Sequence, residues 1–275
     1  MVDVTSLAAL SGHDLHLSYG TRRVVDSASL SLAAAKVTSL VGPNGSGKST
    51  LLRSLARLHR VDSGTVALDG HPDAMLLSRR EFAQRVTLLA QHRPNPSGIT
   101  VRDLVGYGRQ PYLRRWGRSS AEDLQAIEEA MAKTRVSAMA DRPVDELSGG
   151  ELQRVWLASC LAQDASVLLL DEPTTFLDLR HQVEFLDLIC ELAELHNVAV
   201  GVVLHDLNHA AEVSDTIAVM HQGTVRIAGR PEEVLTAELL SEVYGIQIQV
   251  SLDDETGVVH TRPMARRMRS ALSLA

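Results

Sequence analysis

The sequence contains few aromatic residues and carries no excess of positive charge. Aromatic residues make up 3% of the 275 residues, which argues against the stacking platforms that bind single-stranded nucleic acid. The formal net charge is −7, whereas a nucleic-acid-binding surface is usually basic. The composition therefore predicts a protein without a nucleic-acid partner.

Long apolar runs are also absent from the sequence. Candidates such as residues 198–204, VAVGVVL, are far shorter than the roughly 20 residues that a membrane-spanning helix needs. Residues 1–12 lack the basic start and apolar stretch of a secretory signal. Cys160 and Cys190 both lie in helix-like apolar patterns, as expected of buried, reduced thiols. These features predict a soluble, intracellular chain.

Short apolar runs alternate with helix-like segments, a pattern typical of an α/β protein. Two apolar runs within residues 215–229 are joined at Gln222 and Gly223, which predicts a hairpin. The predicted buried strands are residues 36–41, 85–90, 166–171 and 198–206.

Other segments have different patterns. Near the N-terminus, HDLHLSYG, SASLSLAA and GTVALDG predict a small antiparallel sheet. Residues 100–162 are mostly helical in pattern, and Thr100 with Asp103 has the spacing of a capping pair. From about Thr261 the chain is interpreted as a solvated basic tail, which contains Arg262, Arg266, Arg267 and Arg269.

Residues 42–49, GPNGSGKS, match the phosphate-binding loop G-x-x-x-x-G-K-[ST]. They follow a predicted strand and lead into the helix-like TLLRSLARL, which disfavours the alternative of a simple glycine-rich turn. The glycines free backbone N–H groups for phosphate oxygens, Lys48 supplies a positive charge, and Ser49 can ligate Mg²⁺. The predicted nucleotide-binding residues of this loop are Gly42, Pro43, Asn44, Gly45, Ser46, Gly47, Lys48, Ser49 and Thr50.

Polar residues end three further predicted strands. Asp171 and Glu172 follow one strand, Gln91 ends a second, and His205 ends a third. Beside a phosphate loop the first acid commonly holds Mg²⁺, and the second is free to orient or deprotonate an attacking water. Open α/β sheets bind ligands at the carboxyl ends of their strands. These residues, each unremarkable alone, therefore predict a single nucleotide site.

A second anion-binding feature is predicted at residues 147–151, LSGGE. Ser148 and Glu151 have the spacing of a capping box at a helix start. Gly149 and Gly150 occupy the first turn, although better helix formers cost roughly 1 kcal/mol less each. Bare glycines leave N–H groups open, and a helix N-terminus attracts anions. An ordinary capped helix is the alternative interpretation.

These motifs together resemble the nucleotide-binding subunits of ABC transporters, over nearly the whole chain to about residue 250. The LSGGE signature distinguishes that family from other phosphate-loop ATPases. The resemblance implies an α/β fold: a RecA-like P-loop NTPase core, an N-terminal antiparallel β-subdomain and an inserted helical subdomain. It implies one ATPase domain at residues 1–250, with the core at about 1–94 and 163–250 and the helical subdomain at about 95–162. Residues 251–275 are assigned to a C-terminal tail.

The resemblance also implies individual roles. Tyr19 would stack on adenine, and Asp178 matches the family's D-loop. Phe176 departs from the Ala, Ser or His that is usual there, but it leaves the Asp in place. The implied catalytic residues are Glu172, His205 and Gln91, and the implied Mg²⁺ ligands are Ser49, Gln91 and Asp171.

Subunits of this family pair head to tail, so the resemblance implies a homodimer with two identical ATP sites. The signature residues of one chain would meet the γ-phosphate of ATP on the other, and hydrolysis would remove this contact and open the dimer. The residues implied to act in this way are Ser148, Gly149, Gly150 and Glu151.

The cargo is assigned only by similarity. Residues 97–113, 174–188 and 229–246 are similar to the group that imports ferric siderophores, haem and cobalamin. That similarity implies an integral membrane permease, a periplasmic or surface substrate-binding protein, and a peripheral position on the cytoplasmic face of the membrane. A ferric siderophore is the first choice, and haem and cobalamin stay open because the ATPase does not touch the cargo.

Three other classes share part of the pattern. An exporter ATPase would have every nucleotide motif, and only the similarity of residues 97–113 and of the C-terminal segment argues against it. A soluble ABC protein of translation or DNA repair usually has two cassettes or a long coiled-coil insertion, whereas this chain has one phosphate loop. A small-molecule kinase would not need LSGGE.

Overall fold

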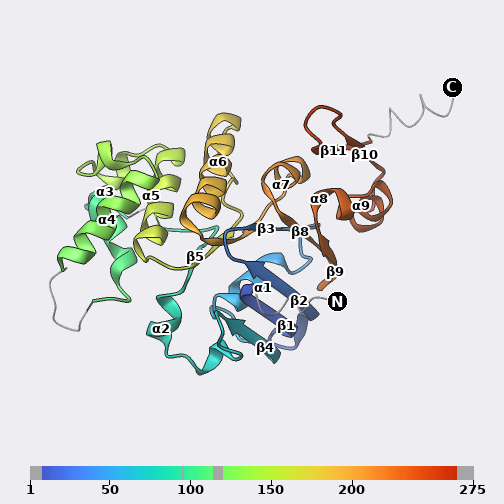
Figure 1. Ribbon diagram of the computed structural model, residues 1–275, viewed down its shortest axis with the longest axis horizontal. Helices are drawn as coiled ribbons and strands as arrows, with labels where there is room; N and C mark the ends of the chain where they lie inside the picture. Colours follow the sequence, from blue (N-terminus) through green and yellow to red (C-terminus); the bar gives the residue numbers. More distant parts are fainter. Residues whose placement is uncertain (1–7, 95, 114–119, 265–275) are drawn as a thin grey trace.

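The computed structural model describes residues 8–94, 96–113 and 120–264. Within these residues the centre is a six-stranded sheet in the order β5-β6-β7-β3-β8-β9 (Figure 1). Neighbouring strands are parallel except for the antiparallel pair β8 and β9. The four predicted buried strands are confirmed. The strands are β3 (Val37–Val41), β5 (Val86–Leu89), β6 (Val167–Asp171), β7 (Ala199–Val203), β8 (Thr216–His221) and β9 (Thr224–Gly229).

The hairpin between β8 and β9 is also confirmed. Its two turn residues have positive φ angles, 49° at Gln222 and 83° at Gly223. A two-residue turn of this kind needs φ above zero at both positions to match the twist of the strands.

The side chains of the parallel strands alternate between two hydrophobic cores. In β6, Val167 and Leu169 face one core, whereas Leu168 and Leu170 face the other. A sheet buried on both faces explains why these strands are apolar throughout. Helix α1 (Lys48–Leu55) contributes to one core, and α6 (Leu179–His196), α7 (Leu207–Val213), α8 (Pro231–Val234) and α9 (Ala237–Tyr244) contribute to the other.

A small antiparallel sheet packs beside α1, as predicted. Its order is β2-β1-β4, and it consists of β1 (Ala8–Tyr19), β2 (Arg22–Ala33) and β4 (Ser63–Leu68). Leucines of β1 and β2, such as Leu17 and Leu32, share the core of α1. The short helix α2 (Arg79–Ala83) leads from this region into β5.

A group of helices at one end of the molecule has a hydrophobic core of its own (Figure 1). The group contains α3 (Val101–Gly106), α4 (Ala121–Lys133) and α5 (Gly149–Ala162). Val105, Ile127 and Val155 belong to its core. The predicted capping pair at its start is confirmed, because Thr100 and Asp103 form a capping box at α3.

The C-terminal part of the described chain corrects a prediction. β10 (Ile248–Leu252) and β11 (Val259–Pro263) form an antiparallel hairpin. The interpretation of residues 251–275 as a tail, solvated from Thr261 onward, is therefore wrong for the residues up to Met264. β10 has the alternation of a strand, with Ile248, Val250 and Leu252 apolar, whereas β11 has no comparable alternation. Arg266, Arg267 and Arg269 lie outside the described residues.

Asn208 of α7 fastens this hairpin to the rest of the molecule. The backbone N–H and the hydroxyl of Thr261 donate to Asn208 Oδ1 at 2.7 and 3.0 Å. Asn208 Nδ2 donates in turn to the Thr261 carbonyl oxygen at 3.3 Å. The side-chain amide of Asn208 thus forms hydrogen bonds with the backbone and the hydroxyl of Thr261, which is buried.

The two cysteines are free thiols. Cys160 is buried as predicted, whereas Cys190 is only partly buried. Burial raises the pKa of both thiols to about 11, so both are largely protonated at neutral pH. Separately, no helix in the described ranges has the length and apolarity that crossing a bilayer requires.

Replacing Asn208 by Ala should detach the hairpin. Because the polar groups of Thr261 would lose their partners, we expect a loss of about 1–3 kcal/mol in the free energy of unfolding, measured in urea. The control is Gln249→Ala, which removes an exposed acceptor of Arg262 and should change stability by less than about 0.5 kcal/mol. Equal effects of both substitutions would contradict the fastening role.

Candidate functional site

Residues 42–47 of the phosphate loop join β3 to α1 at the carboxyl edge of the parallel sheet, and residues 48–50 form the start of α1. Gly42 has a φ of 143°, and a Cβ there would lie 2.1 Å from the carbonyl oxygen of Met220. Only glycine therefore fits this position. The hydroxyl of Ser46 is buried in the loop without a hydrogen-bond partner.

Lys48 folds back onto its own loop. Its Nζ donates to the carbonyl oxygens of Gly42 at 2.8 Å and Pro43 at 3.0 Å. Burial lowers the pKa of Lys48, and the nearby carboxylates of Glu172 and Asp171 oppose that shift. The ammonium group thus lies within electrostatic reach of both acids, with only neutral carbonyl groups as hydrogen-bond acceptors.

Asp171, the last residue of β6, is fully buried. Nε and Nη2 of Arg53 on α1 each lie 3.3 Å from its Oδ2. Its Oδ1 is buried without a hydrogen-bond partner. The sequence analysis missed Arg53, although it lies four residues after Ser49 and so shares a face of α1 with it. One oxygen of a buried carboxylate is therefore unused.

Glu172 joins the ends of three strands through one carboxylate oxygen. Its Oε2 accepts a hydrogen bond from Nε2 of Gln91, which follows β5. The same oxygen lies 2.8 Å from Nε2 of His205, which follows β7. Glu172 itself has a φ of 52°, a conformation uncommon outside glycine. The structure thus brings together the three polar residues predicted at separate strand ends.

Gln153 of α5 makes a second link, which the sequence analysis missed. Its side chain is 8% exposed. Its amide nitrogen donates to the carbonyl oxygen of Pro173, the residue after Glu172, and its oxygen accepts from Arg93. No local pattern distinguishes Gln153 from the other polar residues of the helix.

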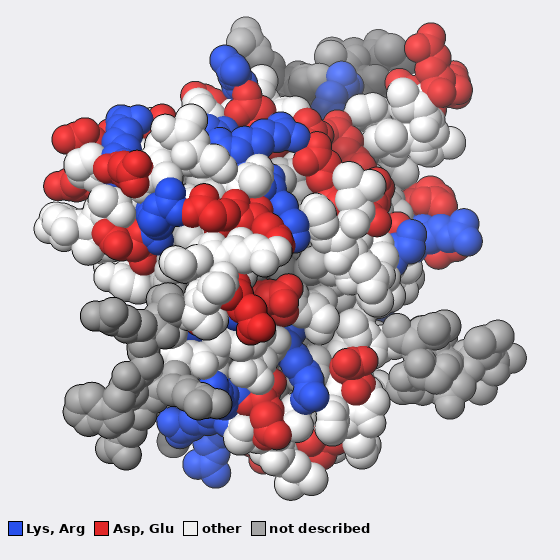
Figure 2. Space-filling view, turned by 60° about the vertical axis from the view of Figure 1, so that its left-hand side comes forward, with Lys and Arg blue, Asp and Glu red and all other residues white. Residues whose placement is uncertain are grey.

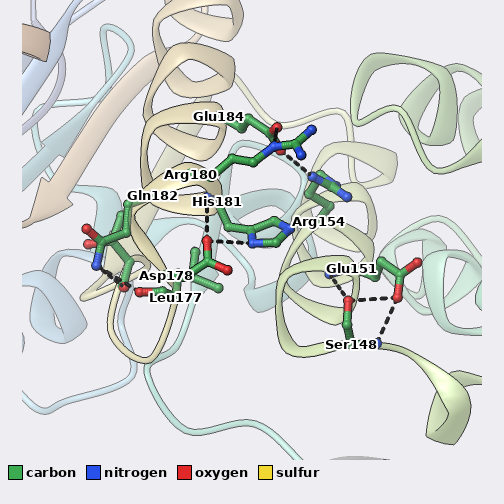
Figure 3. A network of polar contacts seen from close by, with 10 residues as sticks. Ser148, Glu151, Arg154, Leu177, Asp178, Arg180, His181, Gln182 and Glu184 are labelled. Atoms are coloured by element: carbon green, nitrogen blue, oxygen red, sulfur yellow. Dashed lines mark hydrogen bonds and ion pairs between the residues drawn. The ribbon is translucent and has the colours of Figure 1, made fainter.

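Ser148 caps α5 as predicted (Figure 3). Its hydroxyl and backbone N–H donate to Glu151 Oε2 at 2.7 and 2.8 Å, and the Glu151 N–H donates to the hydroxyl at 3.4 Å. Hydrogen bonds from Ser148 lower the pKa of Glu151. The first N–H groups of a helix have no acceptor within it. Those of Gly149 and Gly150 are therefore available to an anion.

Asp178 caps the neighbouring helix, α6, and accepts the backbone N–H of His181 at 2.9 Å (Figure 3). No hydrogen bond or ion pair between described residues joins Asp178 or Ser148 to the phosphate loop of the same chain. The predicted site residues thus form two groups, one around Lys48, Asp171 and Glu172 and one around the starts of α5 and α6.

Two further predicted residues stand apart from these groups. Tyr19 ends β1, is 52% exposed, and has its ring centroid 4.5 Å from that of His59. Phe176 is 91% exposed and has a φ of 71°. The roles predicted for Tyr19 and for the Phe176 segment stay predictions.

Acidic and basic side chains are intermixed over the face shown in Figure 2. No broad basic region occupies that face, and pairs such as Arg135 with Glu191, 2.7 Å apart, are typical of the surface charges.

Comparisons with known proteins agree on one family. Residues 25–175 match a family model described as ABC transporter. The chain is 42% identical over 263 residues to the probable siderophore transport system ATP-binding protein YusV of Bacillus subtilis (strain 168), covering 94% of each chain. It is 40% identical over 261 residues to the ferric enterobactin transport ATP-binding protein FepC of Escherichia coli (strain K12), covering 95% of this chain and 96% of FepC.

Solved structures give the same result. The chain resembles an ABC transporter solved in an inward-facing conformation, with a TM-score of 0.82 and 25% identity. That match covers 95% of this chain and 99% of the solved one. The predicted fold, with its phosphate-loop core, is therefore confirmed.

Replacing Arg53 by Leu would leave the buried carboxylate of Asp171 without its ion-pair partner. Removing one partner of a fully buried pair costs about 3–5 kcal/mol, and because Arg53 is partly exposed we expect about 2 kcal/mol here. Chemical denaturation measures the change. Arg53→Lys should restore part of it, and Arg53→Leu combined with Asp171→Asn should restore more. Parental stability of Arg53→Leu would refute the pairing.

Proposed function

The chain belongs to the ABC transporter family, and from that premise we propose that it is the ATP-hydrolysing subunit of an importer for a ferric siderophore. The observation that carries the ATP-hydrolysing role is the convergence of Gln91 and His205 on the Glu172 carboxylate, beside the buried Lys48. The ferric siderophore is supported by the names of relatives that are 42% and 40% identical over nearly the whole chain. The proposed domain division is a core at residues 1–94 and 163–250 with a helical subdomain at 95–162.

Each polar group of the first site has a proposed task with ATP. The backbone N–H groups of residues 44–50 would surround the β- and γ-phosphates, and Lys48 would exchange its carbonyl acceptors for phosphate oxygens. Glu172 orients and deprotonates the attacking water. Gln91 and His205 hold the same carboxylate oxygen, so they set its direction. Tyr19 stacks on the adenine.

The donor set also fits Mg²⁺. Asp171 Oδ1 is a buried carboxylate oxygen without a partner, and the Ser49 hydroxyl lies one turn before Arg53, which binds the other oxygen. Gln91 is the third proposed ligand. Magnesium bound with nucleotide phosphates needs few protein ligands, in keeping with the absence of a three-residue metal cluster from the described parts of the chain. When bound, Mg²⁺ would neutralise phosphate charge.

A second copy of the chain is proposed to complete each site. The Ser148–Glu151 turn has open N–H groups but is not joined to the phosphate loop of its own chain. Head-to-tail pairing of two copies would place this turn on the partner's γ-phosphate, with two-fold symmetry. Release of phosphate after hydrolysis then removes the contact and opens the dimer.

The transport partners are inferred from relatives. A membrane permease would contact the chain beside Gln91 and the helical segment that follows it, which places the chain at the cytoplasmic face of the membrane. A periplasmic or surface substrate-binding protein would deliver the cargo. The names of the siderophore and enterobactin relatives support a ferric siderophore, with haem and cobalamin as other outcomes of a growth test.

Replacing Glu172 by Gln should separate binding from hydrolysis. The variant should bind ATP and dimerise, whereas its turnover should fall by at least about a hundredfold, because an amide cannot accept the proton of water. Phosphate release and light scattering measure the two properties. Glu255→Gln, in the exposed turn between β10 and β11, is the matched control. Parental turnover of Glu172→Gln would disprove the assignment of the base.

Deleting the gene should prevent growth when iron is supplied as the ferric siderophore, because the permease would lack its source of energy. Free iron at high concentration should restore growth. A deletion strain that grows normally on the siderophore, but fails on haem or cobalamin, would redirect the proposal to that cargo.

A further inference from the structure

The first turns of α5 and α6 lie near each other, and the ring of His181 points from α6 toward the start of α5 (Figure 3). A Cβ at Gly150 would lie 2.8 Å from Cδ2 of the His181 ring, whereas a Cβ at Gly149 would have no atom within 4 Å. Glycine is therefore favoured at these two adjacent positions for different reasons. Gly149 leaves its surroundings open, and Gly150 makes room for the ring of His181.

The same histidine holds Asp178. Its ring Nδ1 lies 2.7 Å from Asp178 Oδ1, the oxygen that also accepts the backbone N–H of His181. The His181 ring thus contacts the Ser148–Glu151 turn with its Cδ2 edge, and its Nδ1 binds the Asp178 carboxylate. The tautomer with a proton on Nδ1 makes this hydrogen bond.

A second contact joins the helices one turn further along. Arg154 of α5 lies 3.1 Å from Glu184 of α6, and Arg180 donates to the same carboxylate at 2.8 Å. The side chains of Arg154 and Glu184 are 21% and 33% exposed. Partial burial gives this ion pair more weight than a fully exposed pair would have.

We propose that His181 is a positioning residue that fixes the Ser148 turn relative to Asp178. This inference rests on the proposed function, in which both groups meet the ATP bound by a second copy of the chain. α5 contributes Val155 and Ala158 to the core of the helical group and Leu157 to the core that contains α6. At the first turns of the two helices, His181 contacts Gly150 and binds Asp178, so that the two groups reach the partner's ATP in one geometry.

The contact itself is tested by chemical denaturation of the full-length parent chain and four variants. Gly150→Ala should lower the unfolding midpoint, because its methyl group would collide with the ring. His181→Asn keeps a donor for Asp178 but removes the bulk that faces Gly150, so it should abolish most of the effect of Gly150→Ala in the double variant. Gly149→Ala, the matched control on the same turn, should not lower the midpoint, because its methyl group enters open space.

The positioning role is tested by a measurement that a change in stability alone would not alter. In chains that also carry Glu172→Gln, the ATP concentration for half-maximal dimerisation is measured by sedimentation. His181→Ala should raise it by about tenfold, a coupling of the size seen between residues in contact. His181→Asn should stay close to the Glu172→Gln parent. The affinity of the monomer for a fluorescent ATP analogue should not change, because the phosphate loop is untouched.

Each unfavourable outcome has a distinct meaning. Two outcomes would overturn the inference about His181 and leave the proposed function intact. One is that Gly150→Ala lowers the unfolding midpoint equally with His or Asn at position 181. The other is that His181→Ala leaves the ATP concentration for half-maximal dimerisation unchanged. If Glu172→Gln binds ATP but never dimerises, the two-chain site fails, and the positioning role of His181 fails with it.

Discussion

The candidate site depends on the parallel register of the central strands. In this register Asp171 pairs with Val203, so β6 and β7 end at the same level and deliver Glu172 and His205 side by side. A shift of one residue would turn every buried side chain of a strand toward the wrong core. It would also separate the carboxylate from its two partners, Gln91 and His205. The apolar pattern of the strands therefore determines the geometry of the polar site.

Two buried side-chain oxygens at this edge of the sheet have no hydrogen-bond partner. Lys48 binds only loop carbonyls, and Ser46 Oγ and Asp171 Oδ1 are buried without partners. Buried polar groups in folded proteins are nearly always paired. A triphosphate with its cation would supply acceptors to Lys48 and Ser46 and a positive charge to Asp171. The N–H groups at the start of α5, which have no acceptor within the helix, also favour an anion, but they lie on another part of the surface.

Local patterns were sufficient to predict the strands, the phosphate loop, the capping box at Ser148 and the polar strand ends, because each depends on neighbours within a few residues. The pairing of Arg53 with Asp171 joins residues far apart in the chain, so only the packing of α1 on the sheet reveals it. The sequence also suggested one reason for both glycines of the signature, whereas Gly150 is required by His181. The β10–β11 hairpin was not predicted, although Ile248, Val250 and Leu252 of β10 alternate with polar residues; β11 has no comparable alternation.

The central claim is that two copies of the chain build one ATP site, and mixing two disabled variants tests it most directly. Both carry Glu172→Gln; one also carries Lys48→Ala and the other Ser148→Arg. Alone, neither can form a complete site, whereas a mixed dimer has one intact phosphate loop facing one intact signature turn. The account predicts ATP-dependent dimers that retain nucleotide only in the mixture. A mixture that retains no more nucleotide than either variant alone would contradict it.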